Sequence, residues 1–264
     1  PLRIGYRTIK DYHATHAMMT LVEVLQHSSN IGTARLALAI GPDRLSQYYK
    51  NLGLTQPAKV ELRESARPLT PRVWNEDAIA STSFGEGIDV SPLALARAYG
   101  ALLNGGYVLP LTIRKLAPGV RVTGPKVISD RTSAEVLELM RANVNCTCGS
   151  GKSAEVPGLN VGGKTGTGNK YDPAIRHYST IKQVSSFAAA FPTDGSPRAQ
   201  RYFVLILMDE PQRGKNGVDP TGGIVAAPAV GKVIERIAPF LDVRPRAPFT
   251  PFPLDANSDA GEEH

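Results

Sequence analysis

Helical and strand patterns occupy separate parts of this chain, and that order limits the fold more than any other feature. Apolar residues recur at helical spacing in residues 20–27, 31–40, 43–52, 93–103 and 130–143. Short apolar or alternating runs bounded by turn residues follow at 159–163, 184–191 and 202–208, and residues 224–241 again have helical spacing. Segregated helices and strands are typical of α+β domains. We therefore expect a helical lobe beside an antiparallel sheet, with the last helix packed on the sheet.

One domain is expected to span residues 1–242. A chain of 264 residues with 42% hydrophobic content can bury a large core. Residues 55–77 are rich in Pro, Arg and Glu without clear periodicity, which indicates an exposed connection. Residues 243–264 are Pro-rich and then polar, so we expect them to form a disordered tail.

The charge of the chain gives little information about partners. The net charge is +6 and the pI is about 9.4, but the Lys and Arg residues are scattered along the chain. This distribution favours a solvated basic surface over a nucleic-acid interface, so no nucleic-acid partner is expected. No apolar run approaches the length of about 18 residues that spans a bilayer, and no signal peptide is visible. Because the chain begins with Pro1 rather than Met, we expect a processed or truncated piece, whose location these absences do not reveal.

Two cysteines, Cys146 and Cys148, are separated by one residue. They are too few for a disulfide framework, and a disulfide across a single residue would be strained. No His or further Cys lies nearby in the sequence to complete a tetrahedral metal site. We expect two loop thiols without a catalytic role, and neither a metal nor a cofactor.

The stretch 158–169 allows two interpretations. Residues 158–165 formally match the phosphate-loop pattern G-x-x-x-x-G-K-[ST]. A phosphate loop must open a helix, however, and Gly166 and Gly168 are poor residues to begin one. The only fair candidate for the second acidic motif of a nucleotide-binding protein is Asp209, which Glu210 and a proline follow. A phosphate-loop nucleotide binder is therefore the weaker interpretation.

The stronger interpretation of the same stretch is a K-T-G element on the edge of a strand. Lys164 supplies a fixed positive charge, and the hydroxyls of Thr165 and Thr167 can bind a substrate carboxylate. Gly166 lets the backbone approach the substrate, and a strand edge can hold an extended peptide by main-chain pairing.

A second polar group lies far upstream, between two predicted helices. Ser28, Ser29 and Asn30 form an S-x-N set, in which a hydroxyl could relay a proton and an amide could hold a substrate amide. The alternative is that Ser28 or Ser29 only caps the helix that begins near Ile31.

Four segments, in this order along the chain, resemble class B penicillin-binding proteins. They are HSSNIGTARLA (27–37), SFGEGIDVSPLA (83–94), GKTGT (163–167) and SFAAAFP (186–192). The pattern is closer to the septal, division-type enzyme than to the elongation-type enzyme. The resemblance implies the fold shared by penicillin-binding transpeptidases and serine β-lactamases, incomplete at its N-terminus.

The resemblance also implies an activity, a location and partners. Members of the family are peptidoglycan D,D-transpeptidases of the inner membrane, which act on stem peptides at the periplasmic face by serine acyl transfer and are acylated by β-lactams. A septal glycosyltransferase and other division proteins are the implied protein partners. Catalytic roles are implied for Ser28 in the proton relay, Asn30 at the substrate amide and Lys164 in the electrostatics of the site. Thr165, Gly166 and Thr167 are implied in substrate binding, with the backbone N–H of Thr167 contributing to the oxyanion hole.

The chain departs from the family pattern in one respect. The nucleophilic serine and basic lysine of the family belong to an S-x-x-K motif upstream of S-x-N, and residues 1–27 contain none. The only S-x-x-K runs from Ser179 to Lys182, in the wrong order and in an expected loop, so we interpret it as a coincidence. We expect this fragment by itself to be inactive. The alternatives left open are an elongation-type transpeptidase, a serine β-lactamase-like protein and a non-catalytic penicillin-binding module.

Overall fold

The computed structural model describes residues 1–13, 17–63, 65–172, 174, 177–214 and 217–246. A helical lobe comes first and contains the elements β1 (Leu2–Ile4), β2 (Arg7–Ile9), α1 (Leu21–Gln26), α2 (Asn30–Ile40), α3 (Pro42–Asn51), α4 (Glu76–Thr82), α5 (Pro92–Leu103) and α6 (Asp130–Asn145). The sheet and its covering helix follow, as the short 3-10 helix η1 (Lys152–Ala154), β3 (Gly162–Asp172), β4 (His177–Phe191), β5 (Tyr202–Asp209), the short π-helix η2 (Gly222–Ala226), α7 (Ala227–Ile237) and the 3-10 helix η3 (Ala238–Leu241).

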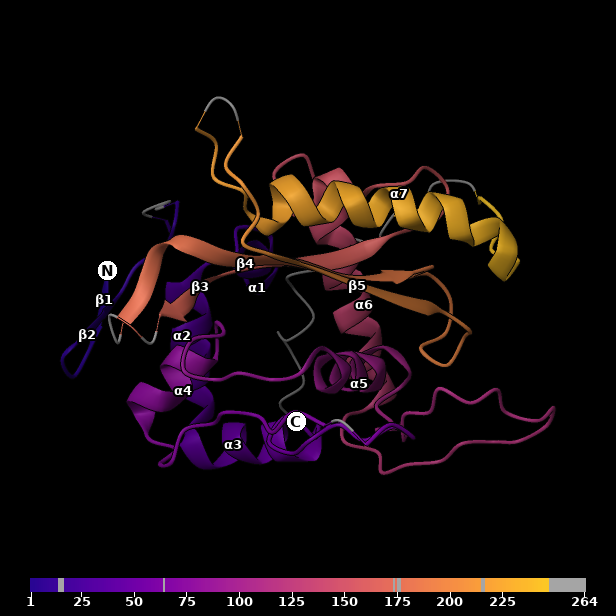
Figure 1. The fold of residues 1–264 in the computed structure, drawn as a ribbon, viewed down its shortest axis with the longest axis horizontal. Coiled ribbons are helices and arrows are strands. Elements are labelled where there is room, and N and C mark those ends of the chain that lie inside the picture. Colours follow the sequence, from indigo (N-terminus) through magenta and orange to yellow (C-terminus); the bar gives the residue numbers. More distant parts are fainter. Residues whose placement is uncertain (14–16, 64, 173, 175–176, 215–216, 247–264) are drawn as a thin grey trace, which may run out of the picture.

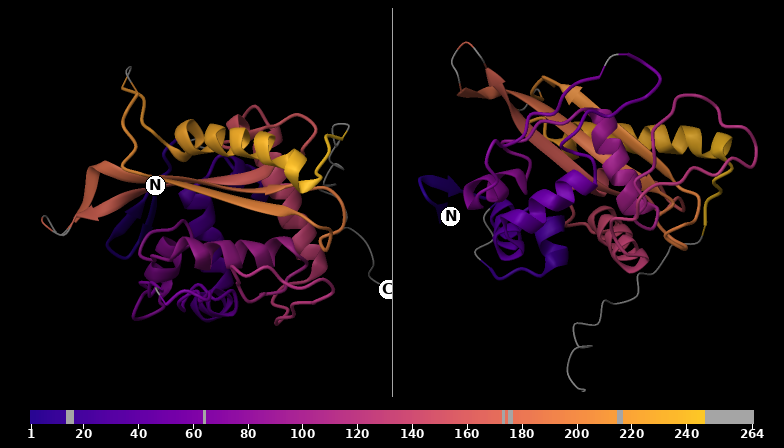
Figure 2. Two further views of the ribbon diagram at one scale, coloured as in Figure 1. Left: turned by 45° about the vertical axis from the view of Figure 1, so that its right-hand side comes forward. Right: turned by 90° about the horizontal axis from the view of Figure 1, so that it is seen from below.

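The main sheet lies between two helical layers. Its strands are antiparallel in the order β3-β4-β5, so β3 and β5 are its edges within the described residues. In Figure 1 the helix α7 covers one face of the sheet, and the helical lobe with α5 lies against the other. Figure 2 shows the same arrangement turned by 45° about the vertical axis and seen from below. The predicted layers are confirmed.

Strand β4 separates the two halves of the core by the alternation of its side chains. Phe187 and Phe191 point into the cluster that contains Val230 and Ile234 of α7. Ala190 points the other way, toward a cluster that contains Leu137 and Met140 of α6. Small residues on this second face let α6 approach the sheet closely. A Cβ on Gly162 of the neighbouring strand would lie only 2.8 Å from the backbone nitrogen of Arg141 in α6.

Local sequence signals explain where most of the helices begin. Ser91 and Ser129 cap α5 and α6 with their side-chain oxygens, and Thr20 forms a capping box with Glu23 at the start of α1. The five predicted helices of the lobe and the closing helix are all present within a few residues of their expected bounds. The short helix α4 and the β1–β2 hairpin were not predicted, because neither is long enough to show a period.

Two expectations, one about the sheet region and one about the tail, need correction. The strand predicted at 159–163 begins at Gly162 and continues through the whole K-T-G stretch to Asp172. The predicted tail starts too early, because Val243 packs against the core and Arg246 donates to both Gly158 and Asp194. Residues 247–264 of that tail lie outside the described residues. Among the helices that the structure describes, none combines the length and the apolarity needed to cross a membrane.

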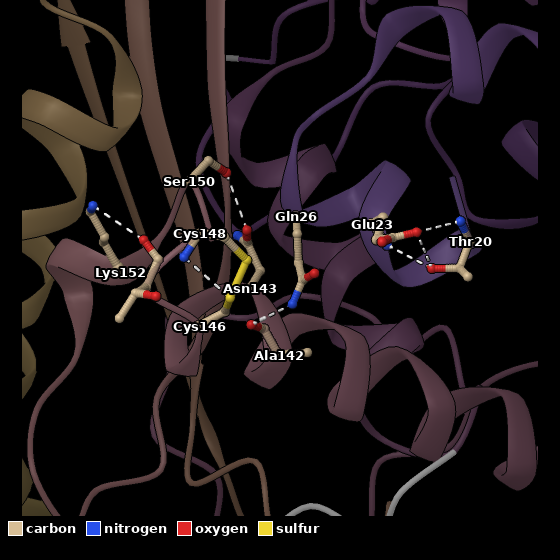
Figure 3. Close-up of a disulfide and its surroundings, with 10 residues drawn as sticks. Thr20, Glu23, Gln26, Ala142, Asn143, Cys146, Cys148, Ser150 and Lys152 are labelled. Atoms are coloured by element: carbon tan, nitrogen blue, oxygen red, sulfur yellow. Dashed lines mark hydrogen bonds between the residues drawn. A yellow bond between two sulfur atoms is a disulfide. The ribbon is translucent and has the colours of Figure 1, made fainter. Parts of the chain in front are cut away.

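The expectation of two loop thiols is wrong. Cys146 and Cys148 form a disulfide in the turn that follows α6 (Figure 3). The turn brings their Cα atoms to 5.1 Å, within the range that a disulfide can bridge. A backbone hydrogen bond from the nitrogen of Gly149 to the carbonyl oxygen of Cys146 (3.0 Å) closes the same turn.

Candidate active site

The K-T-G stretch lies within the edge strand β3, which pairs with β4 on one side. Lys164 is opposite Ala188, and Thr165 is opposite Phe187. Because side chains alternate along a strand, Lys164 and Gly166 face the helical lobe, whereas Thr165 and Thr167 face the side covered by α7. The phosphate-loop interpretation is therefore wrong, since the motif continues as a strand and does not open a helix.

The junction between α1 and α2 exposes Ser28. Its backbone has a φ of 54°, a left-handed conformation that turns the chain between the two helices. Ser29, not Ser28, caps α2 by accepting a hydrogen bond from the nitrogen of Gly32 (2.9 Å). The carboxylate of Asp11 fixes the same end of α2, because it accepts from the hydroxyl of Ser29 and from the nitrogen of Ile31, both at 2.9 Å. The capping alternative thus holds for Ser29, and the hydroxyl of Ser28 is left available for chemistry.

Ser28 and Lys164 meet, although 136 positions separate them. The ammonium group of Lys164 donates to the hydroxyl of Ser28 over 2.7 Å. Lys164 also donates to the carbonyl oxygen of Thr165 (3.0 Å) and to its hydroxyl (3.2 Å). The loss of hydration around this half-buried side chain lowers the pKa of Lys164 to about 8. A lysine with such a pKa can hold a proton and can release it near neutral pH.

The two threonine hydroxyls have different partners. The Oγ1 of Thr165 lies 3.0 Å from the hydroxyl of Ser150, a residue of the turn after the disulfide. The Oγ1 of Thr167 accepts a hydrogen bond from the nitrogen of Gly222 (2.9 Å), which leaves its own proton free to be donated. Gly166, which separates the two threonines in the sequence, leaves no room for a side chain, because a Cβ there would lie 2.5 Å from the hydroxyl oxygen of Ser186.

Asn30 is the predicted site residue that the structure does not bring to Lys164. Its side-chain nitrogen donates to the carbonyl oxygen of Lys10 (3.2 Å), so within the described chain it supports the N-terminal segment. The other five predicted residues, Ser28, Lys164, Thr165, Gly166 and Thr167, lie in the β3 stretch or are bonded to it.

The sequence analysis missed two residues, Asn143 and Ser150, that support the K-T-G stretch by hydrogen bonds. Asn143 is fully buried in the last turn of α6 and donates to the carbonyl oxygen of Gly163 (2.7 Å). Ser150 bonds to both Asn143 and Thr165. The polar Asn143 within an otherwise amphipathic helix was a possible signal, but nothing in the sequence connects it to Gly163.

The downstream S-x-x-K lies in strand β4, so its expected position in a loop is wrong. The hydroxyl of Ser179 accepts from the backbone nitrogens of Ile181 (3.2 Å) and Lys182 (2.8 Å). Asp209, the candidate acidic residue of a nucleotide site, instead forms an ion pair with Lys170 at 2.9 Å. Across the described ranges, no cluster of three or more His, Cys, Asp or Glu side chains could hold a metal ion.

Comparison with known proteins identifies the family of the chain. Residues 2–235 match the family model of the penicillin-binding protein transpeptidase domain. The chain belongs to this transpeptidase family. The resemblance stated from the motifs and the expected fold are thereby confirmed.

The chain is similar in sequence to two proteins named FtsI. The chain is 68% identical over 246 residues to the probable peptidoglycan D,D-transpeptidase FtsI of Caulobacter vibrioides, covering 92% of this chain and 42% of that protein. It is 32% identical over 249 residues to the peptidoglycan D,D-transpeptidase FtsI of Escherichia coli K12, covering 94% of this chain and 40% of that protein. The chain therefore spans less than half the length of these relatives.

Solved structures of the family share the fold. The transpeptidase domain of penicillin-binding protein 3 from Burkholderia pseudomallei has a TM-score of 0.76 and 33% identity, over 87% of this chain and 67% of that one. Penicillin-binding protein 3 from Mycobacterium tuberculosis, solved in complex with ampicillin, has a TM-score of 0.75 and 28% identity, over 89% of this chain and 54% of that one.

Proposed function

We propose that this chain forms the substrate-binding part of a division-type peptidoglycan D,D-transpeptidase, an enzyme of septal cell-wall synthesis that β-lactams acylate. The observation that carries the proposal is the contact between Lys164 and Ser28, which joins the S-x-N and K-T-G elements in one group. The name of the relative that is 68% identical, and the ampicillin complex of a structural neighbour, support the same activity and inhibitor class.

In the proposed reaction a serine attacks the penultimate D-alanine carbonyl of a stem peptide and expels the last D-alanine. The basic lysine of the S-x-x-K motif takes the proton of the attacking serine, and the hydroxyl of Ser28 relays this proton to the leaving amine. Lys164 holds the hydroxyl of Ser28 by a charged hydrogen bond. An amine from a second stem peptide attacks the acyl-enzyme, restores the serine and completes the cross-link. A β-lactam stops the cycle at the acyl-enzyme.

Binding of the substrate carboxylate is assigned to Lys164, Thr165 and Thr167. Lys164 supplies the positive charge, and the two hydroxyls each have a proton to donate once a carboxylate arrives. Beyond Thr165 the edge of β3 can pair with the extended substrate, and the backbone N–H of Thr167 can donate to the oxyanion. Asn30 is proposed to bind the substrate amide, which requires its side chain to leave the carbonyl of Lys10.

The nucleophile must come from outside this 264-residue chain, because no S-x-x-K precedes Ser28. We accordingly propose that a longer protein is the enzyme, that it lies at the periplasmic face of the inner membrane, and that it works with a septal glycosyltransferase and other division proteins. The 264 residues by themselves would then form a non-catalytic module.

The test is intact mass spectrometry after incubation with a penicillin. The longer protein should gain one penicillin, and Ser28→Ala and Lys164→Ala should slow the gain at least about 100-fold, since each removes a part of the relay. Ser179→Ala should react like the unchanged protein. The 264-residue chain by itself should gain no mass. An adduct mapped to Ser28 or Ser179 would refute the assignment.

A further inference from the structure

A line of polar groups runs from β3 through the turn that follows the disulfide to the last turn of α6. From the site inward it consists of the ammonium of Lys164, the hydroxyl of Thr165, the hydroxyl of Ser150 and the side-chain amide of Asn143. The successive distances are 3.2 Å, 3.0 Å and 3.2 Å. Figure 3 shows Ser150 pointing at Asn143 beside the disulfide.

The direction of this hydrogen-bonded chain is fixed at both ends. The side-chain nitrogen of Asn143 must face the carbonyl oxygen of Gly163, because that oxygen can only accept. The oxygen Oδ1 of Asn143 therefore faces Ser150, and it too can only accept. At the other end a charged lysine can only donate. Protons must then point from Lys164 to Thr165, from Thr165 to Ser150 and from Ser150 to Asn143.

The turn that carries Ser150 is fastened to three elements. It starts at the end of α6, where the Cys146–Cys148 disulfide closes it, and a Cβ on Gly149 would collide with the backbone carbonyl of Asn143. The nitrogen of Ser150 donates to the carbonyl oxygen of Gln26 at the end of α1 (3.2 Å). The side chain of Gln26 in turn donates to the carbonyl oxygen of Ala142 (3.1 Å; Figure 3). Ser150 is thus held between the helix that leads to Ser28 and the strand that carries Lys164.

We propose that Ser150 and Asn143 are positioning residues for substrate binding, which set the direction of the Thr165 hydroxyl. In the free site the proton of Thr165 is held by Ser150. When a carboxylate arrives, Thr165 turns its proton to the carboxylate, and Ser150 turns its own proton from Asn143 to the oxygen of Thr165. The oxygen of Thr165 stays hydrogen-bonded in both states. The buried Oδ1 of Asn143 gives up the proton of Ser150, and the charged hydrogen bond from Thr165 to the carboxylate offsets that loss.

This inference rests on the proposed function, and its test uses the longer protein that contains the nucleophile. The measured quantities are the dissociation constant of the penicillin before acylation and the rate constant of acylation. Ser150→Ala removes the hydroxyl partner of Thr165 and should weaken pre-covalent binding by up to about tenfold. A tenfold change corresponds to about 1.4 kcal/mol, the upper end of the range for one neutral hydrogen bond. The rate constant of acylation should change little, whereas the thermal midpoint should fall, because the buried Oδ1 of Asn143 loses its donor. Ser150→Thr keeps a hydroxyl and should restore binding to within about threefold.

Two controls separate positioning from general damage to the site. Ser153→Ala removes an exposed hydroxyl three residues further along and should have no effect. The methyl ester of the same penicillin lacks the carboxylate charge, so the difference between Ser150→Ala and the unchanged protein should shrink with it. A merely structural role of Ser150 would weaken binding of the acid and the ester equally.

The inference is overturned if Ser150→Ala binds the penicillin like the unchanged protein, if Ser150→Thr fails to restore binding, or if acid and ester are affected alike. If the proposed function itself is wrong, the result differs: the unchanged longer protein would not be acylated by the penicillin at all.

Discussion

The packing of Gly163 against Phe187 allows a sharp test of how the K-T-G strand is held. A Cβ added to Gly163 would lie 2.5 Å from the Cζ atom of Phe187 and 2.8 Å from the carbonyl oxygen of Ala188. Carbon atoms normally approach to about 3.5–4.0 Å, so about 1 Å of movement is required. The ring of Phe187 is fully buried, and a Cβ on Gly151 would lie only 3.1 Å from the same Cζ atom. Because the ring has no space to retreat, the strand must move.

Gly163→Ala should therefore lower the free energy of unfolding of the β3–β4 region by about 1–3 kcal/mol, as overpacking does in cores. The same shift moves Lys164 away from Ser28, which it contacts at 2.7 Å. Since a displacement of about 1 Å can cost up to about 100-fold in rate, acylation by a penicillin should slow at least about tenfold.

Gly168→Ala is a matched control on the same strand. A Cβ at Gly168 meets no atom within 4 Å, and its backbone does not have a positive φ. This change should leave acylation unaltered and change stability by no more than about 1 kcal/mol, with stabilisation the expected sign. The assays are hydrogen exchange of peptides that cover β3 and β4, and the rate of penicillin labelling of the longer protein. Equal behaviour of the two alanine variants would refute the packing argument.

Three further predictions concern charge and the disulfide. The acylation efficiency of the longer protein should fall as pH rises through about 8, where Lys164 loses the charge that attracts the carboxylate, and this limb should be absent in any active Lys164→Arg variant. Arg141→Met should lower the unfolding free energy by about 2–4 kcal/mol in denaturant titration, because Arg141 is 5% exposed and binds the carboxylate of Glu155 and the carbonyl oxygen of Val161. Arg131→Met is the control: it removes the exposed ion pair with Glu135 and should lower the unfolding free energy by less than about 0.5 kcal/mol. Replacing Cys146 and Cys148 together by Ser should cost about 1–2 kcal/mol, the chain-entropy value for so short a loop, and an unchanged transition would count against a cross-link.

The sequence by itself determined the local structure and the chemistry of the motifs. Caps such as Ser91 and Ser129, and the apolar period of each long helix, depend on residues within a few positions of one another. The separation of helices from strands followed from the same signals. Ser28, Lys164 and Thr165 were predicted as site residues because the S-x-N set, the K-T-G stretch and two further segments, in this order, resemble class B penicillin-binding proteins.

Only the tertiary structure decided how those residues are held together. Strand β3 has too few apolar residues to show an alternation, and it exists because its backbone pairs with β4. Asn143 looks like an ordinary helical residue until burial obliges it to find a partner at Gly163. The contact of Ser150 with Thr165 and the contact of Ser28 with Lys164 depend on where the fold brings the chain back to itself. Such contacts are set by packing over long sequence distances, which local patterns do not encode.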